Sequence, residues 1–186
     1  MKKQFIAKLL VLVMVLTMVP GTMLVSKAAA SNNQYYYVPA DTSVSTSSAS
    51  SVDAKDITTA DGEATIKVTV KNGVSAVTLT AKAVEGLADV AADGAITLVL
   101  EDDGAEKLNL SFPAKEMKKL AEDTSADLTI KSSVATITIP NNVLASALGN
   151  AGTVKVSAQH TAKAVGFTVQ VRGKSLKSAK GIVVEF

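Results

Sequence analysis

The chain has 186 residues, with no cysteine, no tryptophan, and 19 basic against 17 acidic side chains. Disulfide bonds and thiol chemistry are therefore excluded. The first 30 residues carry four lysines and no acidic residue, which leaves 15 basic and 17 acidic groups in the rest of the chain. That balance argues against nucleic-acid binding, which needs a strongly basic surface.

The N-terminus has the layout of a secretory signal peptide. Basic residues precede an apolar run over 9–19, and a small-residue stretch over 28–30 follows it. An apolar run of this length is short for a membrane span, which needs about 20 residues, so a retained anchor is the less favoured alternative. We predict a signal peptide over 1–30, cleaved after Ala30 or after Ala28, and a protein that is secreted or held at the cell surface.

Residues 31–53 predict a linker. Ser and Thr dominate its centre, and such a stretch has too little apolar surface to offset the entropy lost on ordering. Tyr35, Tyr36 and Tyr37 lie near its start. These tyrosines are candidates to dock on the following domain or to contact a partner, although an ordinary N-terminal arm explains them as well.

From Glu63 onward, apolar and polar residues alternate with a period of two, which is typical of strands with one face in a core and the other in water. The apolar positions of the predicted strands are Ile66/Val68/Val70, Val77/Leu79, Ile96/Leu98/Leu100, Leu108/Leu110/Phe112, Leu128/Ile130, Ile137/Ile139, Val154/Val156, Phe167/Val169/Val171 and Ile182/Val184/Phe186. Thr, Lys and Ser dominate the alternate positions, so we expect a wetted outer sheet face. The three Phe residues of this set are expected in the core.

Three segments between the strands change to a helical period. Their apolar faces are Val84/Leu87/Ala88/Ala91, Met117/Leu120/Ala121 and Val143/Leu144/Ala147/Leu148. Pro113 and Pro140 are expected at the first helical position, where the missing N–H has no partner to lose. Gly149 and Gly152 are expected to close the third helix. Turns are predicted at 102–104, 132–133 and 172–174.

These pieces recur along the chain. Residues 108–120 match 135–147 with Pro aligned on Pro at an offset of 27, and a weaker copy covers 77–98. Such self-similarity predicts stacked units that bury their apolar faces together. We therefore predict one α+β domain over 54–186. It has a mostly antiparallel or mixed sheet built from repeated strand–Pro–short helix–strand units, with the helices packed on one side.

Few residues in the sequence are candidates for catalysis or for binding a metal or cofactor. His160 is the single histidine, and one imidazole at a strand end is expected on the surface. The sequence contains no Gly-x-Ser-x-Gly elbow, phosphate-binding loop or dinucleotide fingerprint. Four carboxylates in Glu101-Asp102-Asp103-Gly104-Ala105-Glu106 resemble a calcium loop in kind, but their spacing departs from the EF-hand pattern and a polar turn explains them. We predict no enzyme, no catalytic or metal-ligating residue, and no cofactor.

The repeat carries a resemblance to a known family. Leu110-Ser-Phe-Pro113-Ala-Lys-Glu-Met117, Ala126-Asp127-Leu-Thr-Ile130 and Ala135-Thr-Ile-Thr-Ile-Pro140 resemble the repeat-bearing domain found upstream of S-layer homology (SLH) modules in surface proteins of Gram-positive bacteria such as clostridia and paenibacilli. The resemblance covers about residues 60–186. It implies a secreted, envelope-associated protein whose SLH modules bind cell-wall polymer. This chain shows no recognisable SLH module, and its last strand fits a partial reading frame or a stand-alone domain equally well.

Together these features predict a structural or spacer module of an exported cell-envelope protein, with cell-wall polymer or other surface proteins as its candidate partners and no retained membrane span. The alternative is a secreted binding module for a cell-wall glycan or a protein partner. Glycan sites usually offer exposed aromatic platforms, and only the tyrosines of the predicted linker are left over for that role.

Overall fold

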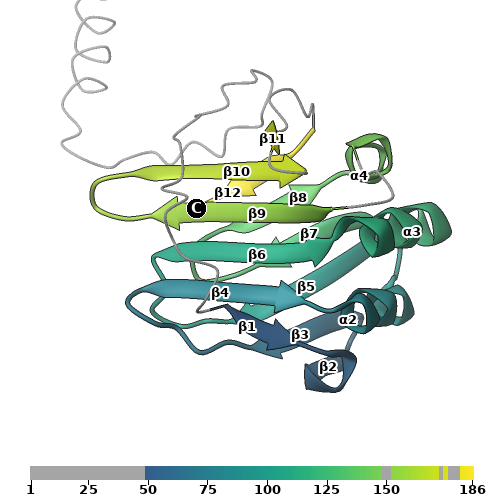
Figure 1. The fold of residues 1–186 in the computed structure, drawn as a ribbon, viewed down its shortest axis with the longest axis horizontal. Helices are drawn as coiled ribbons and strands as arrows, with labels where there is room; N and C mark the ends of the chain where they lie inside the picture. Colours follow the sequence, from purple (N-terminus) through teal and green to yellow (C-terminus); the bar gives the residue numbers. More distant parts are fainter. Residues whose placement is uncertain (1–48, 148–151, 172–173, 176–180) are drawn as a thin grey trace, which may run out of the picture. The chain divides into compact units, whose positions relative to one another are not determined.

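The computed structural model describes residues 49–147, 152–171, 174–175 and 181–186. In these ranges the chain forms two mixed β-sheets, three α-helices and two 3-10 helices (Figure 1). The α+β class and the mixed strand directions are as predicted. The predicted signal peptide, Tyr35–Tyr37 and most of the predicted linker lie outside the described residues.

The first sheet, sheet A, has six strands. In spatial order they are β1 (Ser50–Val52), β4 (Val74–Leu79), β6 (Lys107–Pro113), β9 (Thr153–His160), β10 (Val165–Val171) and β11 (Lys174–Ser175). β1, β4 and β6 run parallel, and β9, β10 and β11 join them by antiparallel pairs. Because β1 lies inside the range 31–53 predicted as linker, the folded domain begins earlier than residue 54.

The second sheet, sheet B, also has six strands. They are β12 (Val183–Glu185), β8 (Thr136–Ile139), β7 (Asp127–Lys131), β5 (Ala95–Glu101), β3 (Glu63–Lys67) and β2 (Ile57–Ala60). β3, β5 and β7 are parallel, and antiparallel strands complete both edges. The sequence predicted one sheet, whereas the structure divides the strands between two.

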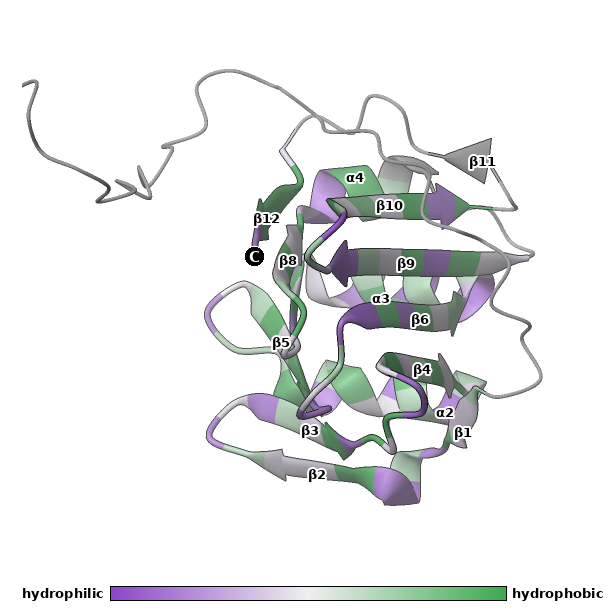
Figure 2. Ribbon diagram, turned by 90° about the vertical axis from the view of Figure 1, so that its left-hand side faces the viewer, coloured by the Kyte–Doolittle hydropathy of each residue, from purple (hydrophilic) through white to green (hydrophobic). Residues whose placement is uncertain are grey.

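One core fills the space between the sheets. Val77, Leu110 and Val156 of sheet A join Ile66, Leu98 and Ile130 of sheet B in a single cluster of buried side chains. Figure 2 shows the alternation of hydrophobic and hydrophilic residues along β6 and β9 that produces this arrangement. The period-two prediction is confirmed for the central strands, because each of them has one face on this core.

The predicted alternation of buried and exposed residues is wrong in two places, after β3 and after β12. Val68 and Val70 were predicted to extend a strand, but β3 ends at Lys67, and these residues are only partly buried. The reason is that the chain leaves sheet B here and crosses to β4 in sheet A. Phe186, predicted in the core, is 47% exposed because it follows β12 at the edge of sheet B. Phe112 is fully buried as predicted, and Phe167 is partly buried.

The helices lie together at one end of the two sheets (Figure 1). They are η2 (Ala54–Asp56), α2 (Ala81–Gly86), η3 (Leu87–Val90), α3 (Ala114–Thr124) and α4 (Asn141–Ala147). α3 contacts both α2 and α4. The face predicted for α3, which includes Met117 and Leu120, is buried.

The first predicted helical face is partly wrong. α2 ends at Gly86 and continues as the 3-10 helix η3, which has three residues per turn. Val84, Leu87 and Val90 are therefore buried at a spacing of three, and Ala88 is exposed.

Both prolines lie one residue earlier than predicted. Pro113 is the last residue of β6 and the N-cap of α3, with an extended backbone. The carbonyl of Pro140, just before α4, accepts from the N–H groups of Val143 and Leu144 at 3.0 and 3.1 Å. A proline in this position still gives up no helical hydrogen bond, and its ring sets the strand-to-helix turn. The backbone N–H of Asn141, at the start of α4, donates to the Asp127 carboxylate at 2.7 Å.

The strand–helix–strand order occurs at the three predicted places, but the three segments are not equivalent. β4–α2–β5 and β6–α3–β7 cross from sheet A to sheet B, whereas β8–α4–β9 crosses from sheet B to sheet A. The internal repeat as a structural unit remains a prediction.

The predicted turns at 102–104 and 132–133 are present. The N–H of Ala105 donates to the carbonyl of Asp102 at 3.1 Å, and that of Ser132 donates to the carbonyl of Ala135 at 3.2 Å. β10 and β11 pair antiparallel with Val171 opposite Lys174, so Lys174 of the predicted turn lies in β11, and residues 172–173 of that turn lie outside the described residues. A further turn joins β2 to β3 through Asp61-Gly62, where both residues have positive φ, as a two-residue hairpin turn requires.

Candidate functional site

The outer face of sheet B carries two rows of side chains that are polar except for Val99. Strand register places Glu63, Thr97, Thr129 and Thr138 opposite one another across four strands, and Thr65, Val99, Lys131 and Thr136 in the next row. We call these eight residues the threonine face. They alternate with buried residues along each strand, so the wetted face predicted from the sequence is present.

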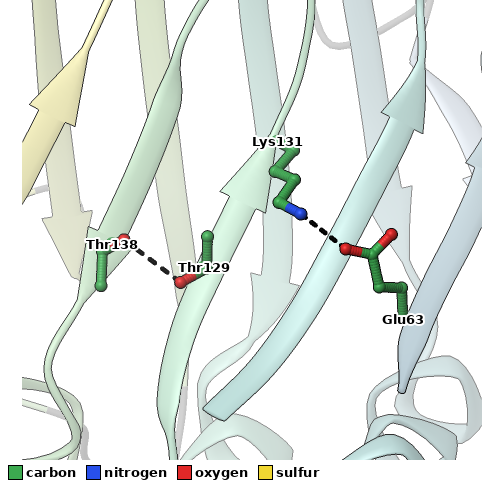
Figure 3. Close-up of polar contacts among 4 residues, drawn as sticks. All are labelled: Glu63, Thr129, Lys131 and Thr138. Carbon is green, nitrogen blue, oxygen red and sulfur yellow. Dashed lines mark hydrogen bonds and ion pairs between the residues drawn. The ribbon is translucent and has the colours of Figure 1, made fainter. Parts of the chain in front are cut away.

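The threonine face is held by contacts between its own side chains (Figure 3). The hydroxyls of Thr129 and Thr138 lie 3.1 Å apart on neighbouring strands. The ammonium of Lys131 on β7 reaches over β5 to the carboxylate of Glu63 on β3. These two side chains are 47% and 40% exposed, so solvent screens the ion pair and it contributes at most about 1 kcal/mol.

This face can take part in hydrogen bonding but has no reactive centre. Threonine hydroxyls both donate and accept, which suits water or a polar surface. Its single acidic and single basic side chain are already paired with each other. Nothing on it resembles a nucleophile activated by a neighbouring base.

The predicted calcium candidate is a structural turn. Asp102 is buried, and its Oδ1 accepts from the N–H of Ser133 at 2.8 Å. The Ser133 hydroxyl donates to the Asp102 carbonyl, also at 2.8 Å. These bonds join the β5–β6 turn to the β7–β8 turn. Within the described ranges, no group of three or more His, Asp or Glu side chains could hold a metal ion.

His160 lies at the end of β9, exposed as predicted. Its ring makes an edge contact with Phe186, with centroids 5.8 Å apart and the planes at 73°. Its backbone N–H donates to the carbonyl of Glu106 at 2.9 Å. In the part of the chain that the structure describes, the imidazole makes no hydrogen bond to a carboxylate, which a general base oriented for catalysis would need.

Asp53 is the one carboxylate with a clear electrostatic perturbation among the residues described. Its Oδ1 accepts from the N–H of Ala54 and from the hydroxyl of Thr80, each at 2.9 Å. The backbone bond first, and the Thr80 bond second, hold the pKa of Asp53 below its ordinary value because both stabilise the ionised form. Thr80 in turn caps α2 by accepting from the N–H of Ala83 at 3.2 Å. The perturbed acid is therefore a capping group that ties η2 to α2.

Sequence reasoning missed the long-range members of these contacts. Asp102 was considered as a member of a polar turn or as a metal ligand, without a partner in another turn, and Asp53 was placed in a linker. Asp followed within three residues by another Asp, as at Asp53 and Asp56, is a local capping signal that was available. The pairing of Asp102 with Ser133 has no such signal, because it depends on which turns the fold brings together.

None of the helices in the described ranges is long and apolar enough to cross a membrane. No family model, curated protein or solved structure matches the chain.

Proposed function

We propose that this chain is a non-enzymatic structural or spacer module of an exported bacterial cell-envelope protein of the S-layer-associated type. The observation that carries the proposal is the use of polar side chains in the described domain. Asp53, Asp102 and Asp127 bind backbone N–H groups of other residues, and Glu63 pairs with Lys131. Polar groups that join one element to another support a structural role over a chemical one.

The proposed location rests on the sequence. The basic, apolar and small-residue order of the first 30 residues supports export. The absence of cysteine means that the domain needs no oxidising partner to fold outside the cell. The resemblance of residues 60–186 to domains that precede SLH modules supports an envelope setting.

A binding experiment tests the role. The chain from Ser31 onward is mixed with purified peptidoglycan and, separately, with secondary cell-wall polymer, and retained protein is measured against concentration. We expect no saturable retention on either polymer. Saturable retention would instead favour the alternative of a binding module. A Thr97→Ala/Thr129→Ala/Thr138→Ala variant then tells whether the threonine face is responsible, with Thr78→Ala on sheet A as its control.

The proposed localisation outside the cell is tested separately. The full chain is expressed in a Gram-positive host, and the N-terminus of the product is sequenced. We expect a product in the wall or culture fraction that begins at Ser31 or Ala29. A full-length, unprocessed chain in the cytosol would contradict export.

A further inference from the structure

β2 forms an open edge of sheet B. Among the described residues it pairs with β3 alone, and Figure 2 shows it at the rim of the sheet. Thr58, Thr59 and Ala60 are exposed, and Ile57 is partly buried against the core. An edge strand presents unpaired backbone groups and accepts a further strand on that side. β2 is therefore a candidate surface for strand pairing with another chain.

The strand register shows which backbone groups of β2 point toward β3. In an antiparallel pair, successive residues direct their N–H and C=O groups alternately toward the partner strand and away from it. The N–H of Val68, just after β3, donates to the carbonyl of Glu101 on β5 at 3.0 Å. Even-numbered residues of β3 therefore bond toward β5, and odd-numbered ones toward β2. Thr65 is one of the latter, so Thr58, which lies opposite it, directs its backbone groups to β3.

The residues on either side of Thr58 direct their backbone groups to the open edge. These are Ile57 and Thr59. The N–H of Ile57 already donates to the carbonyl of Ala54 within the chain. The carbonyl of Ile57 and both backbone groups of Thr59 are left for a partner strand.

β2 lacks the features that protect an edge strand from pairing with other chains. Protected edges are usually very short, or carry a lysine, a proline or a bulge. β2 has no charged residue and no proline, and its four residues pair one to one with β3, without a bulge. The other edge strands in the described ranges are shorter, with three residues each in β1 and β12 and two in β11. Of the four edges, β2 offers a partner the longest one.

We propose that β2 pairs antiparallel with β2 of a second copy of this chain, about a two-fold axis. Thr58 then lies opposite Thr58 of the second copy, and Ile57 lies opposite its Thr59. In this register the Thr59 N–H of each copy donates to the Ile57 carbonyl of the other, which gives two hydrogen bonds between the chains. The pairing joins two six-stranded sheets into one continuous sheet.

The side chains of β2 are complementary to those of a second copy. Two Thr58 side chains facing each other would repeat the pair of Thr129 and Thr138, which lie directly opposite on antiparallel strands of the same sheet with their hydroxyls 3.1 Å apart. Thr58 also lies opposite Thr65, so it continues one row of the threonine face. The pairing therefore makes the threonine faces of the two copies continuous.

The charges at the two ends of β2 favour the same register. Continued beyond the strand, it places the exposed Lys55 of each copy level with the exposed Asp61 of the other, so the two-fold axis produces two such pairs. The nearby Asp56 is bound within its own chain, because its Oδ2 accepts from the N–H of Asp53 at 2.9 Å. Opposite charges therefore meet at both ends of the contact.

The contact is small. Four residues from each copy bury less than the roughly 1,200 Å² at which stable interfaces begin, so we expect weak association, with a Kd on the order of 0.1–1 mM. The inference does not depend on the proposed function, because a spacer and a binding module would present the same edge.

The first test uses the lack of cysteine in the chain. In the proposed register the Cα atoms of the two Thr58 residues lie about 4.5 Å apart, which a disulfide bond can span. Ala60→Cys is the matched control, since Ala60 is exposed on the same face of β2 but would lie more than about 13 Å from its equivalent. During air oxidation of the chain from Ser31 onward, we expect Thr58→Cys to form a disulfide-linked dimer at least roughly tenfold faster than the control.

A charge reversal tests the ends of the contact. Lys55→Glu, combined with Thr58→Cys, places an acidic side chain level with Asp61 of the second copy. It should slow the oxidation of Thr58→Cys about tenfold at low salt and by less at high salt, because salt screens the repulsion between exposed charges. The Ala60→Cys rate should change much less.

The second test removes a donor at the edge. Thr59→Pro deletes an N–H that points away from β3, so the hairpin keeps its own hydrogen bonds, and proline is tolerated at such an edge position. In sedimentation equilibrium, the weight-average mass of the natural chain should rise above that of one copy as its concentration approaches about 1 mM, and that of Thr59→Pro should stay at one copy. If Thr59→Pro lowers the urea midpoint, Lys55→Glu replaces it in this measurement, with the same expected result at low salt.

Three results would refute the proposal. A natural chain that keeps the mass of one copy at every concentration would mean that β2 does not pair with a second copy. Equal oxidation rates for Thr58→Cys and Ala60→Cys would mean that the two-fold register is wrong. Association that neither Thr59→Pro nor Lys55→Glu weakens would mean that the copies meet through another surface.

Discussion

The contact between Asp102 and Ser133 gives the sharpest quantitative prediction. Asp102→Ala removes the bond from the Ser133 N–H to Oδ1, at 2.8 Å. It leaves in place the two bonds to the Asp102 carbonyl, from the Ser133 hydroxyl and from the Ala105 N–H. A hydrogen bond to a carboxylate contributes about 1.5–3 kcal/mol. Part of this is offset, because Oδ2 of Asp102 is buried without a partner and because Ser133 is exposed, so water can replace the lost acceptor. We expect a net loss of about 1–2 kcal/mol in the free energy of unfolding.

The assay is urea unfolding followed by far-UV circular dichroism at neutral pH. In thermal unfolding followed by the same signal, the expected loss for a domain of about 130 residues corresponds to a fall in Tm of roughly 3–10 °C. Asp103→Ala is the matched control, since Asp103 occupies the same turn and is exposed. It should change stability by less than about 0.5 kcal/mol. If both variants have the same midpoint and slope, Asp102 does not join the two turns as argued.

Three further outcomes are expected. The lowered pKa of Asp53 means that its bonds stabilise the fold above the ordinary aspartate pKa of 3.8 and lose that effect as pH falls through the folded-state value. The stability advantage of the natural chain over Asp53→Asn in urea titrations should therefore be constant near neutrality and shrink in acid, and an advantage independent of pH would contradict this. Ser125 ends α3 with φ of 52°, a left-handed conformation that glycine adopts without strain. Ser125→Gly should raise the free energy of unfolding by about 0.5–1 kcal/mol, and a loss would show that the serine is not strained. Phe112→Ala should cost about 3–5 kcal/mol because the ring is fully buried. Phe186→Ala should cost less than about 1 kcal/mol, and similar costs for the two would refute their assignment to core and edge.

Local patterns predicted much of the secondary structure. Leu108, Leu110 and Phe112 alternate with polar residues, and all three face the core from β6. Alternation works here because every second side chain of a strand points to the same side, whatever strand lies next to it. Met117 and Leu120 were predicted on the buried face of a helix for the equivalent reason at helical spacing.

The incorrect predictions have identifiable causes. Phe186 continues the same parity as Ile182 and Val184, but parity does not tell whether a strand lies at the centre or the edge of a sheet. The 3-10 geometry of η3 depends on how Leu87 and Val90 fit the core, which propensity does not report. Asp61-Gly62 could have been predicted, because an Asp-Gly pair between two strands is a strong hairpin signal.

For the threonine face, the sequence pattern determined which side chains face water, and the strand register determined which of them lie next to one another. The alternating sequence by itself determined that threonines would lie on the wetted side of their strands, since side-chain direction is a local property of extended backbone. Only the tertiary structure decided that Thr97, Thr129 and Thr138 form one row and that Lys131 reaches Glu63. The same holds for the division into two sheets and for the contact of Asp102 with Ser133. Partner choice is a competition among distant segments for backbone hydrogen bonds and a shared core, and it is settled by the packing of the whole domain.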